Sequence, residues 1–247
     1  MHQIRIIHSP YKEDKGIPIQ GIFKCDVGNW TCFAAAVITV VLISGVCFAY
    51  DDEGFQYWST ANVTFDSDKD WKITFEEEFR FGDDGGHLYY QHSDLGFVYK
   101  SLADWIDLGL NYKQVFEKDD KGTWRPENRP HLNITLKGKL FDIDLTNRSR
   151  LEYRDRENKE DIWRYRNKFS VKLPLELTAL KLQPYLADEV FVDFYGDRIN
   201  RNRLYSGVSF KLSKNIRGEV FYLWQTSKSG GGWKDISVIG TKLKFYF

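Results

Sequence analysis

Polar and apolar side chains alternate along most of the chain after residue 50. Between Trp163 and Leu173 most odd positions are aromatic or aliphatic, whereas the even positions are Arg, Lys and Ser. Residues two apart lie about 200° apart on a helix, so a helix would mix the two sets, and only a strand separates them onto opposite faces. The pattern therefore predicts an amphipathic strand here.

The same alternation recurs in about eleven segments. Many of them span roughly 10 to 15 residues, longer than the five or six of an ordinary strand, and a tilted transmembrane strand needs roughly 9 to 11. Tight turns are expected at 67–70, 137–139 and 213–215, and longer loops at 82–87, 117–123, 155–161, 195–200 and 227–232. We expect an antiparallel transmembrane outer-membrane β-barrel of about 10–12 strands.

Aromatic residues strengthen this prediction. They make up 16% of the chain, and an aromatic girdle at the bilayer surface is expected from six tryptophans near predicted strand ends: Trp71, Trp105, Trp124, Trp163, Trp224 and Trp233. The last residues, "IGTKLKFYF", resemble the C-terminal signature that the barrel-assembly machinery recognises, with Phe247 at the end. Strand length, tryptophan placement and the terminal Phe favour a barrel over an exported soluble β-sandwich, whose strands also alternate.

The number of strands stays open. Ten strands from Trp71 to Phe247 form an even set whose two ends lie on the periplasmic side. Residues 55–66 either add an eleventh strand that needs a twelfth, or lie inside the lumen.

Residues 33–49 form the one uninterrupted apolar run, which ends at Ala49 before polar residues. It predicts a secretory signal peptide cleaved after Ala49, so we divide the chain into an N-terminal extension with signal peptide, 1–49, and a barrel domain, 50–247. An uncleaved anchor is the alternative, since the run is near the lower length limit for a membrane helix. A lipoprotein site at Cys47 is disfavoured because Val46, rather than a small residue, precedes it. The segment before the run is long, so we expect the true start downstream of Met1.

Charge and cysteine content agree with export. The chain carries 35 basic and 35 acidic residues, which argues against a nucleic-acid partner. All three cysteines precede Ala49, so a cleaved product has no thiol and suits an oxidising compartment. The predicted location is the outer membrane of a Gram-negative bacterium, in contact with its lipid and lipopolysaccharide.

The inward faces of the predicted strands are rich in arginine. One hypothesis is a structural salt-bridge network, and the other is a restricted pathway for a small anionic solute; a barrel this narrow disfavours a wide porin. The expected acidic partners are Glu76, Glu78, Glu127, Asp144 and Glu189. The candidate lumen ladder comprises Glu78, Arg80, Glu127, Arg129, Arg148, Arg150, Glu152, Arg154, Arg164, Arg166, Lys168, Glu189, Arg201 and Arg203.

An outer-membrane lipid or lipopolysaccharide hydrolase is the alternative function. Such enzymes present His and Ser two apart on one strand face, but His92 and Ser93 are adjacent and so face opposite ways. His92 shares a face with Asp94, which would allow a general-base pair, but no Ser accompanies them on that face. His87 and His131 stand alone in sequence, so we predict no catalytic residue, metal or cofactor.

Seven motifs together resemble the bacterial family catalogued as domain of unknown function 2490. The resemblance covers roughly residues 55–247 and implies an outer-membrane β-barrel without an established activity. The motifs are "FRF" at 79, "HSDLGF" at 92, "ENRPHLN" at 127, "RSRLEYR" at 148, "WRYRNK" at 163, "LQPYLADEVF" at 182 and "RNRLYSGVSFKLS" at 201.

Overall fold

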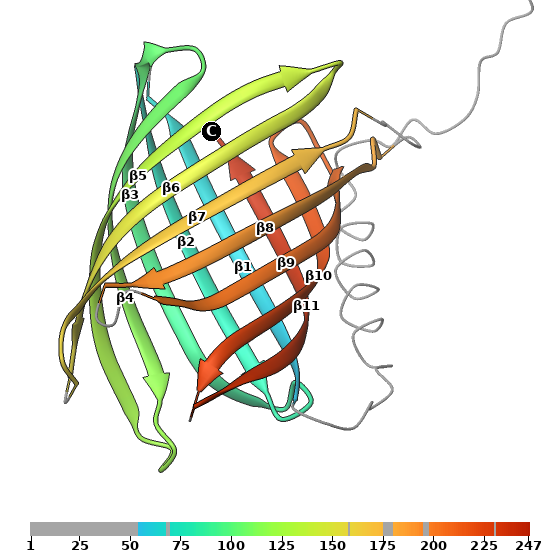
Figure 1. Cartoon of the computed structure of the whole chain (residues 1–247). Helices are drawn as coiled ribbons and strands as arrows, with labels where there is room; N and C mark the ends of the chain where they lie inside the picture. The colour runs from blue at the N-terminus through green and yellow to red at the C-terminus, as the bar shows by residue number, and fades with distance from the viewer. Residues whose placement is uncertain (1–53, 68–69, 158, 175–179, 195–197, 230) are drawn as a thin grey trace, which may run out of the picture. The chain divides into compact units, whose positions relative to one another are not determined.

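The computed structural model describes residues 54–67, 70–157, 159–174, 180–194, 198–229 and 231–247, and the predicted signal peptide lies outside them. Eleven strands form one closed barrel (Figure 1), which confirms the predicted all-β class. The strands are β1 (Phe55–Asp66), β2 (Trp71–Gly82), β3 (His87–Ala103), β4 (Ile106–Lys118), β5 (Trp124–Leu140), β6 (Ile143–Arg156), β7 (Ile162–Lys172), β8 (Gln183–Asp193), β9 (Arg198–Lys211), β10 (Ile216–Ser229) and β11 (Gly232–Tyr246). No helix in the described part of the chain is long and apolar enough to span a bilayer.

The barrel closes through a parallel pair, β1 with β11. An odd number of strands cannot close with antiparallel pairs alone, so one pair must be parallel; the other ten are antiparallel. The pairing runs from Phe55↔Ser237 to Thr64↔Tyr246, and backbone bonds of 2.9 Å continue it to Phe247. Residues 55–66 are therefore a wall strand, and no twelfth strand is needed.

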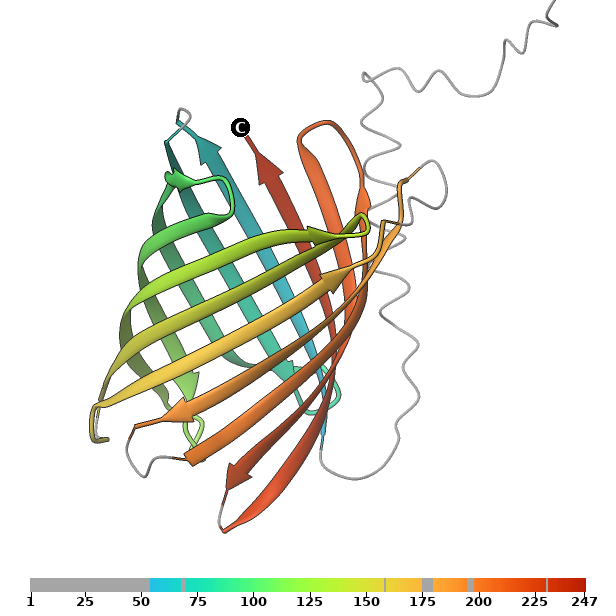
Figure 2. The same ribbon diagram turned by 45° about the horizontal axis from the view of Figure 1, so that its top comes forward.

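This topology gives the barrel two distinguishable rims. In Figure 2 the arrows of β1 and β11 point the same way, so β1 starts at the rim opposite Phe247. We call the rim with Phe247 the C-terminal rim and the other the N-terminal rim. We expected the first and last strands to have their outer ends at one rim. This holds if the barrel is counted from Trp71, because β2 starts at the rim where β11 ends. It does not hold once β1 is included, because β1 starts at the opposite rim.

Apolar side chains cover the outside, whereas most of the buried inward side chains are polar or charged. On β5, Leu132, Ile134 and Leu136 are 55%, 46% and 41% exposed, whereas His131, which precedes them and faces inward, is 2% exposed. Strands of 11 to 17 residues with this alternation have the length and pattern of membrane-spanning strands.

The connections differ from the predicted contrast between short turns and long loops. The "KGK" segment at 137–139 belongs to β5, and the turn follows at Phe141 and Asp142, whose positive φ angles of 47° and 66° fit a two-residue hairpin turn. Ten residues separate Lys172, where β7 ends, from Gln183, where β8 begins, and both strand ends lie at the rim to which the predicted tight turns at 67–70 and 213–215 belong. Loop length alone therefore does not distinguish the rims.

Five of the six tryptophans lie at or beside a strand end, as predicted. Trp71 and Trp124 begin their strands, Trp163 and Trp233 are second in theirs, and Trp105 is in the β3–β4 turn. The sixth prediction is wrong, because Trp224 lies inside β10 opposite Leu204.

Gly240 lies in the closing strand where an added side chain has no room. A Cβ at this position would overlap the ring of Phe221, which projects from β10. We predict that Gly240→Ala lowers the free energy of unfolding by about 1–3 kcal/mol, measured by urea unfolding of the full chain in detergent. Gly138→Ala is the matched control, because nothing lies within 4 Å of its Cβ, and it should change stability by about 0.5 kcal/mol or less. Equal effects of the two substitutions would contradict this packing.

Candidate functional site

The lumen contains a central cavity of about 190 Å³ whose lining is mostly charged. Of the fourteen predicted ladder residues, twelve line this cavity. The other two, Glu127 and Glu152, are buried and ion-paired with its arginines. The period-two pattern thus located the inward faces, although it did not determine which charges pair.

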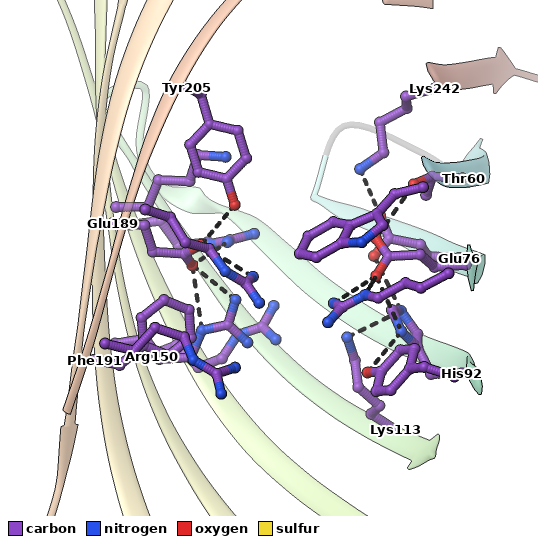
Figure 3. A pocket seen from close by; sticks show the side chains of 18 of the residues that line it. Thr60, Glu76, His92, Lys113, Arg150, Glu189, Phe191, Tyr205 and Lys242 are labelled. Atoms are coloured by element: carbon purple, nitrogen blue, oxygen red, sulfur yellow. Dashed lines mark hydrogen bonds and ion pairs between the residues drawn. The ribbon is translucent and has the colours of Figure 1, made fainter. Parts of the chain in front are cut away.

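Two carboxylates, Glu152 and Glu189, pair with most of the arginines of β6, β7 and β9. Figure 3 shows Glu189 on the left, beside Tyr205. Glu189, 1% exposed, accepts hydrogen bonds from Arg166 Nη2 at 2.7 Å and from the Tyr205 hydroxyl at 3.0 Å. Glu152 is fully buried and within 4.0 Å of the guanidinium groups of Arg150, Arg164 and Arg166. Because several cations share each carboxylate, removing either acid leaves buried positive charge uncompensated.

Further ion pairs lie toward the N-terminal rim. Glu127 accepts two hydrogen bonds of 2.8 Å from Arg129 and one of 2.9 Å from Arg154 Nη2. Asp193 accepts one of 2.9 Å from Arg164. These charge-assisted bidentate contacts cross-link β5 to β6 and β7 to β8, in addition to the backbone ladder.

The opposite wall carries its own cluster, from β2, β3, β4 and β11 (Figure 3, right). Lys242 Nζ donates to Glu76 at 2.8 Å and Arg80 Nε to Glu78 at 2.7 Å. His92 Nε2 lies 3.0 Å from Lys113 Nζ. Because β1 lies between β11 and β2, the Lys242–Glu76 pair spans the closing seam.

The ligand atoms of Glu76, Glu78 and His92 lie within 4.8 Å of one another, which is a spacing that can hold a metal ion. Each of them, however, already has a cationic neighbour: Lys242, Arg80 and Lys113 respectively. A divalent cation would meet three positive charges there. We therefore assign this cluster to ion pairing.

Arginine–aromatic stacks fill the half of the lumen next to the N-terminal rim. The Arg80 guanidinium lies 3.8 Å from the ring centre of Trp58 and 4.0 Å from that of Tyr90. Arg203 lies 4.8 Å from the rings of Trp58 and Phe191. Cation–π contacts of this kind strengthen when water is excluded. We call this filled half the plug; its buried apolar members include Trp58, Tyr90, Val115, Phe191, Leu223 and Val238.

The other half is open and basic. A vestibule of about 840 Å³ at the C-terminal rim reaches from the β3–β4 turn to the inner cavity. The two share five lining residues: Arg148, Lys168, Tyr185, Glu219 and Lys242. Its lining has seven cations and three carboxylates, an excess of four positive charges. The side chain of Arg148 is 35% exposed here, against 8% for Arg164 in the plug. We call this half the cup.

The residues considered for hydrolysis are arranged differently from the prediction. His131 does not stand alone, because its Nε2 lies 3.1 Å from Asp94 Oδ2, and it replaces His92 as the partner of that carboxylate. Its other ring nitrogen faces Asn133 at 3.1 Å rather than a hydroxyl. Ser93 lies on the outer face, as predicted, and donates to Glu77 at 2.6 Å.

The predicted acidic partners have mixed outcomes. Glu127 and Glu189 do pair with ladder arginines, whereas Glu76 binds Lys242 across the seam. Asp144 was wrong: it forms an exposed pair with Lys139. Asp193 was missed, although it continues the inward alternation after Glu189 and Phe191.

Comparisons with known proteins give a family and a likeness in fold to solved structures. The family model described as "Protein of unknown function (DUF2490)" matches residues 55–235. No curated protein matches the chain. Among solved structures, LpxR from Salmonella typhimurium is similar with a TM-score of 0.49 and 10% identity, covering 75% of this chain and 87% of that chain.

Substitution of Glu189 tests whether the balance of buried charges stabilises the folded barrel. We predict that Glu189→Gln lowers the free energy of unfolding by about 3–5 kcal/mol, because it leaves the adjacent arginines uncompensated. Urea unfolding of the full chain in detergent measures the change.

The control is Asp144→Asn, which removes an exposed carboxylate and should cost about 1 kcal/mol or less. Adding Arg166→Met to Glu189→Gln should cost less than the sum of the single changes, since it removes one uncompensated cation. A Glu189→Gln protein as stable as the Asp144→Asn protein would contradict the account.

Proposed function

The chain belongs to the DUF2490 family of proteins of unknown function, and we propose that it is a non-enzymatic outer-membrane barrel of a Gram-negative bacterium that admits small anions into a one-ended lumen. The apolar outer face supports membrane insertion, because exposed Leu, Ile and Phe side chains along the strands suit lipid contact. The tryptophans near strand ends support an interfacial girdle.

The observation that carries this proposal is the division of the lumen into plug and cup. Anions entering the cup meet an excess of four positive charges between low-dielectric walls, which concentrates counter-ions. Beyond it, Trp58, Arg80 and Tyr90 stack beside the inner cavity, whose volume of about 190 Å³ is far smaller than the 840 Å³ of the cup. The lumen therefore suits restricted entry of anions better than free passage.

We place the mouth of the cup on the periplasmic side. Phe247 ends its strand at that rim, where its backbone bonds to Thr64 and its ring stacks on Phe65 with centroids 5.4 Å apart. In this proposal the barrel-assembly machinery engages the same C-terminal strand before β1 closes the barrel over it. Outer-membrane lipid and lipopolysaccharide surround the apolar face.

The alternative, a lipid hydrolase, gains no support from the Asp94–His131 pair. A general base needs a nucleophile within hydrogen-bond reach, but the ring nitrogen of His131 that does not face Asp94 lies 3.1 Å from the Asn133 amide. The pair is also held by Lys113, whose Nζ lies 3.4 Å from Asp94. This surrounding suits a structural ion-pair network.

Single-channel recording in planar bilayers tests the proposal. We predict no steady conductance from the folded full chain, and discrete anion-selective currents when Phe191→Ala and Leu223→Ala shorten two buried plug side chains. Heat-modifiable migration on gels verifies that each protein is folded. The control is Trp224→Ala, which removes an outward aromatic ring of the same strand as Leu223 and should stay silent.

Two results would contradict the proposal. Steady conductance of the unaltered protein would show that the plug does not close the lumen. Cation-selective current through the opened variant would show that the cup does not favour anions.

A further inference from the structure

Two cations lie directly opposite each other at the floor of the cup. Arg148 of β6 and Lys168 of β7 are cross-strand partners, and both line the cup and the inner cavity. Like charges in directly opposed positions destabilise a sheet unless something compensates them. On its other side Lys168 is opposite Glu189 of β8, but that one carboxylate also pairs with Arg166 and Arg203.

Glu189 is the one carboxylate within ion-pair distance of this pair in the described part of the chain. Its Oε1 lies 3.4 Å from Arg148 Nη2 but only 2.7 Å from Arg166 Nη2, so Arg166 holds it more closely. Its Oε2 accepts the Tyr205 hydroxyl. Lys168 makes a 3.5 Å contact with the Tyr205 ring and, among described residues, no hydrogen bond or ion pair.

Hydroxyl groups and another lysine continue the site toward the mouth. Thr146 and Ser170 are cross-strand partners one inward position from Arg148 and Lys168, and both line the cup. Lys172 follows at the next inward position. Within the described residues neither hydroxyl has a side-chain hydrogen-bond partner, so both are available as donors.

We propose that this part of the cup floor, formed by Arg148, Lys168, Thr146, Ser170 and Lys172, is a binding site for a phosphate monoester group. The proposal rests on the proposed anion-admitting function and specifies its ligand class. A phosphate monoester carries about −1.5 to −2 charge at neutral pH, which matches two undercompensated cations. Its three terminal oxygens match a guanidinium fork, an ammonium and two hydroxyls, whereas a carboxylate offers two oxygens and one charge.

Calorimetric titration of the folded full chain in detergent tests the site. We expect inorganic phosphate to bind about tenfold more tightly than acetate, and Lys168→Met or Arg148→Met to weaken phosphate binding by about tenfold or more, because each removes a charge-assisted contact. Lys168→Arg keeps the charge and should retain binding. The matched control is Lys139→Met, a cup-lining lysine whose 71%-exposed side chain pairs with Asp144 instead; it should change binding by about twofold or less.

Glycerol 3-phosphate and micelles containing phosphatidic acid distinguish the source of the phosphate. Tighter binding of the first identifies a free monoester, and tighter binding of the second identifies a lipid headgroup. Equal binding of acetate and phosphate, or equal losses in Lys139→Met and Lys168→Met, would overturn the site while leaving a diffusely basic cup intact. If neither phosphate nor acetate binds the unaltered protein, the proposed phosphate site is wrong. Whether the cup admits anions is decided separately, by the ion selectivity of the barrel whose plug has been opened by substitution.

Discussion

The need to neutralise charge inside a narrow closed barrel governs this structure. Glu152 and Glu189 are almost fully buried and each faces several guanidinium groups. An uncompensated buried charge costs about 3–5 kcal/mol, a large part of the roughly 5–15 kcal/mol that separates folded from unfolded proteins. The pairs therefore constrain how the strands can close, because each carboxylate must meet cations from other strands.

Closure in turn depends on the parallel seam. Bacterial outer-membrane barrels usually have an even number of strands, and this chain closes eleven by pairing β1 parallel to β11. The seam brings Lys242 to Glu76, residues 166 positions apart in sequence, and also places Trp58 beside the arginines it stacks against. Without β1 in the wall, the plug would lack its central aromatic ring.

Sequence pattern predicted the barrel and the inward residues because both follow from a period of two. Arg148, Arg150 and Arg166 could be placed in the lumen from alternation alone. The pairing could not be predicted, since it depends on strand tilt and on which strands meet at closure. The same limit explains why Asp144 was expected to pair with the ladder arginines although it lies near a rim. It also explains why the role of Trp58 was missed, since residues 55–66 had no assigned place.

At the β5–β6 hairpin the prediction failed for a different reason, because local composition indicated a turn at a position where the strand continues. The small, polar "KGK" segment at 137–139 favours a turn by composition. The strand instead continues to Leu140 and turns at Phe141 and Asp142, with Phe141 89% exposed. The continued pairing of Leu140 with Ile143 extends the apolar outer face, and this long-range register outweighs local turn preference.

The most direct test of the one-ended lumen is thiol accessibility. With the three native cysteines replaced by serine, Ser170→Cys would report on the cup and Val115→Cys, at a fully buried inward position, on the plug. The account predicts that a negatively charged methanethiosulfonate reagent modifies the thiol at position 170 rapidly and leaves the thiol at position 115 of the folded barrel protected. Equal modification rates at the two positions would contradict a lumen that is open at one rim and filled at the other.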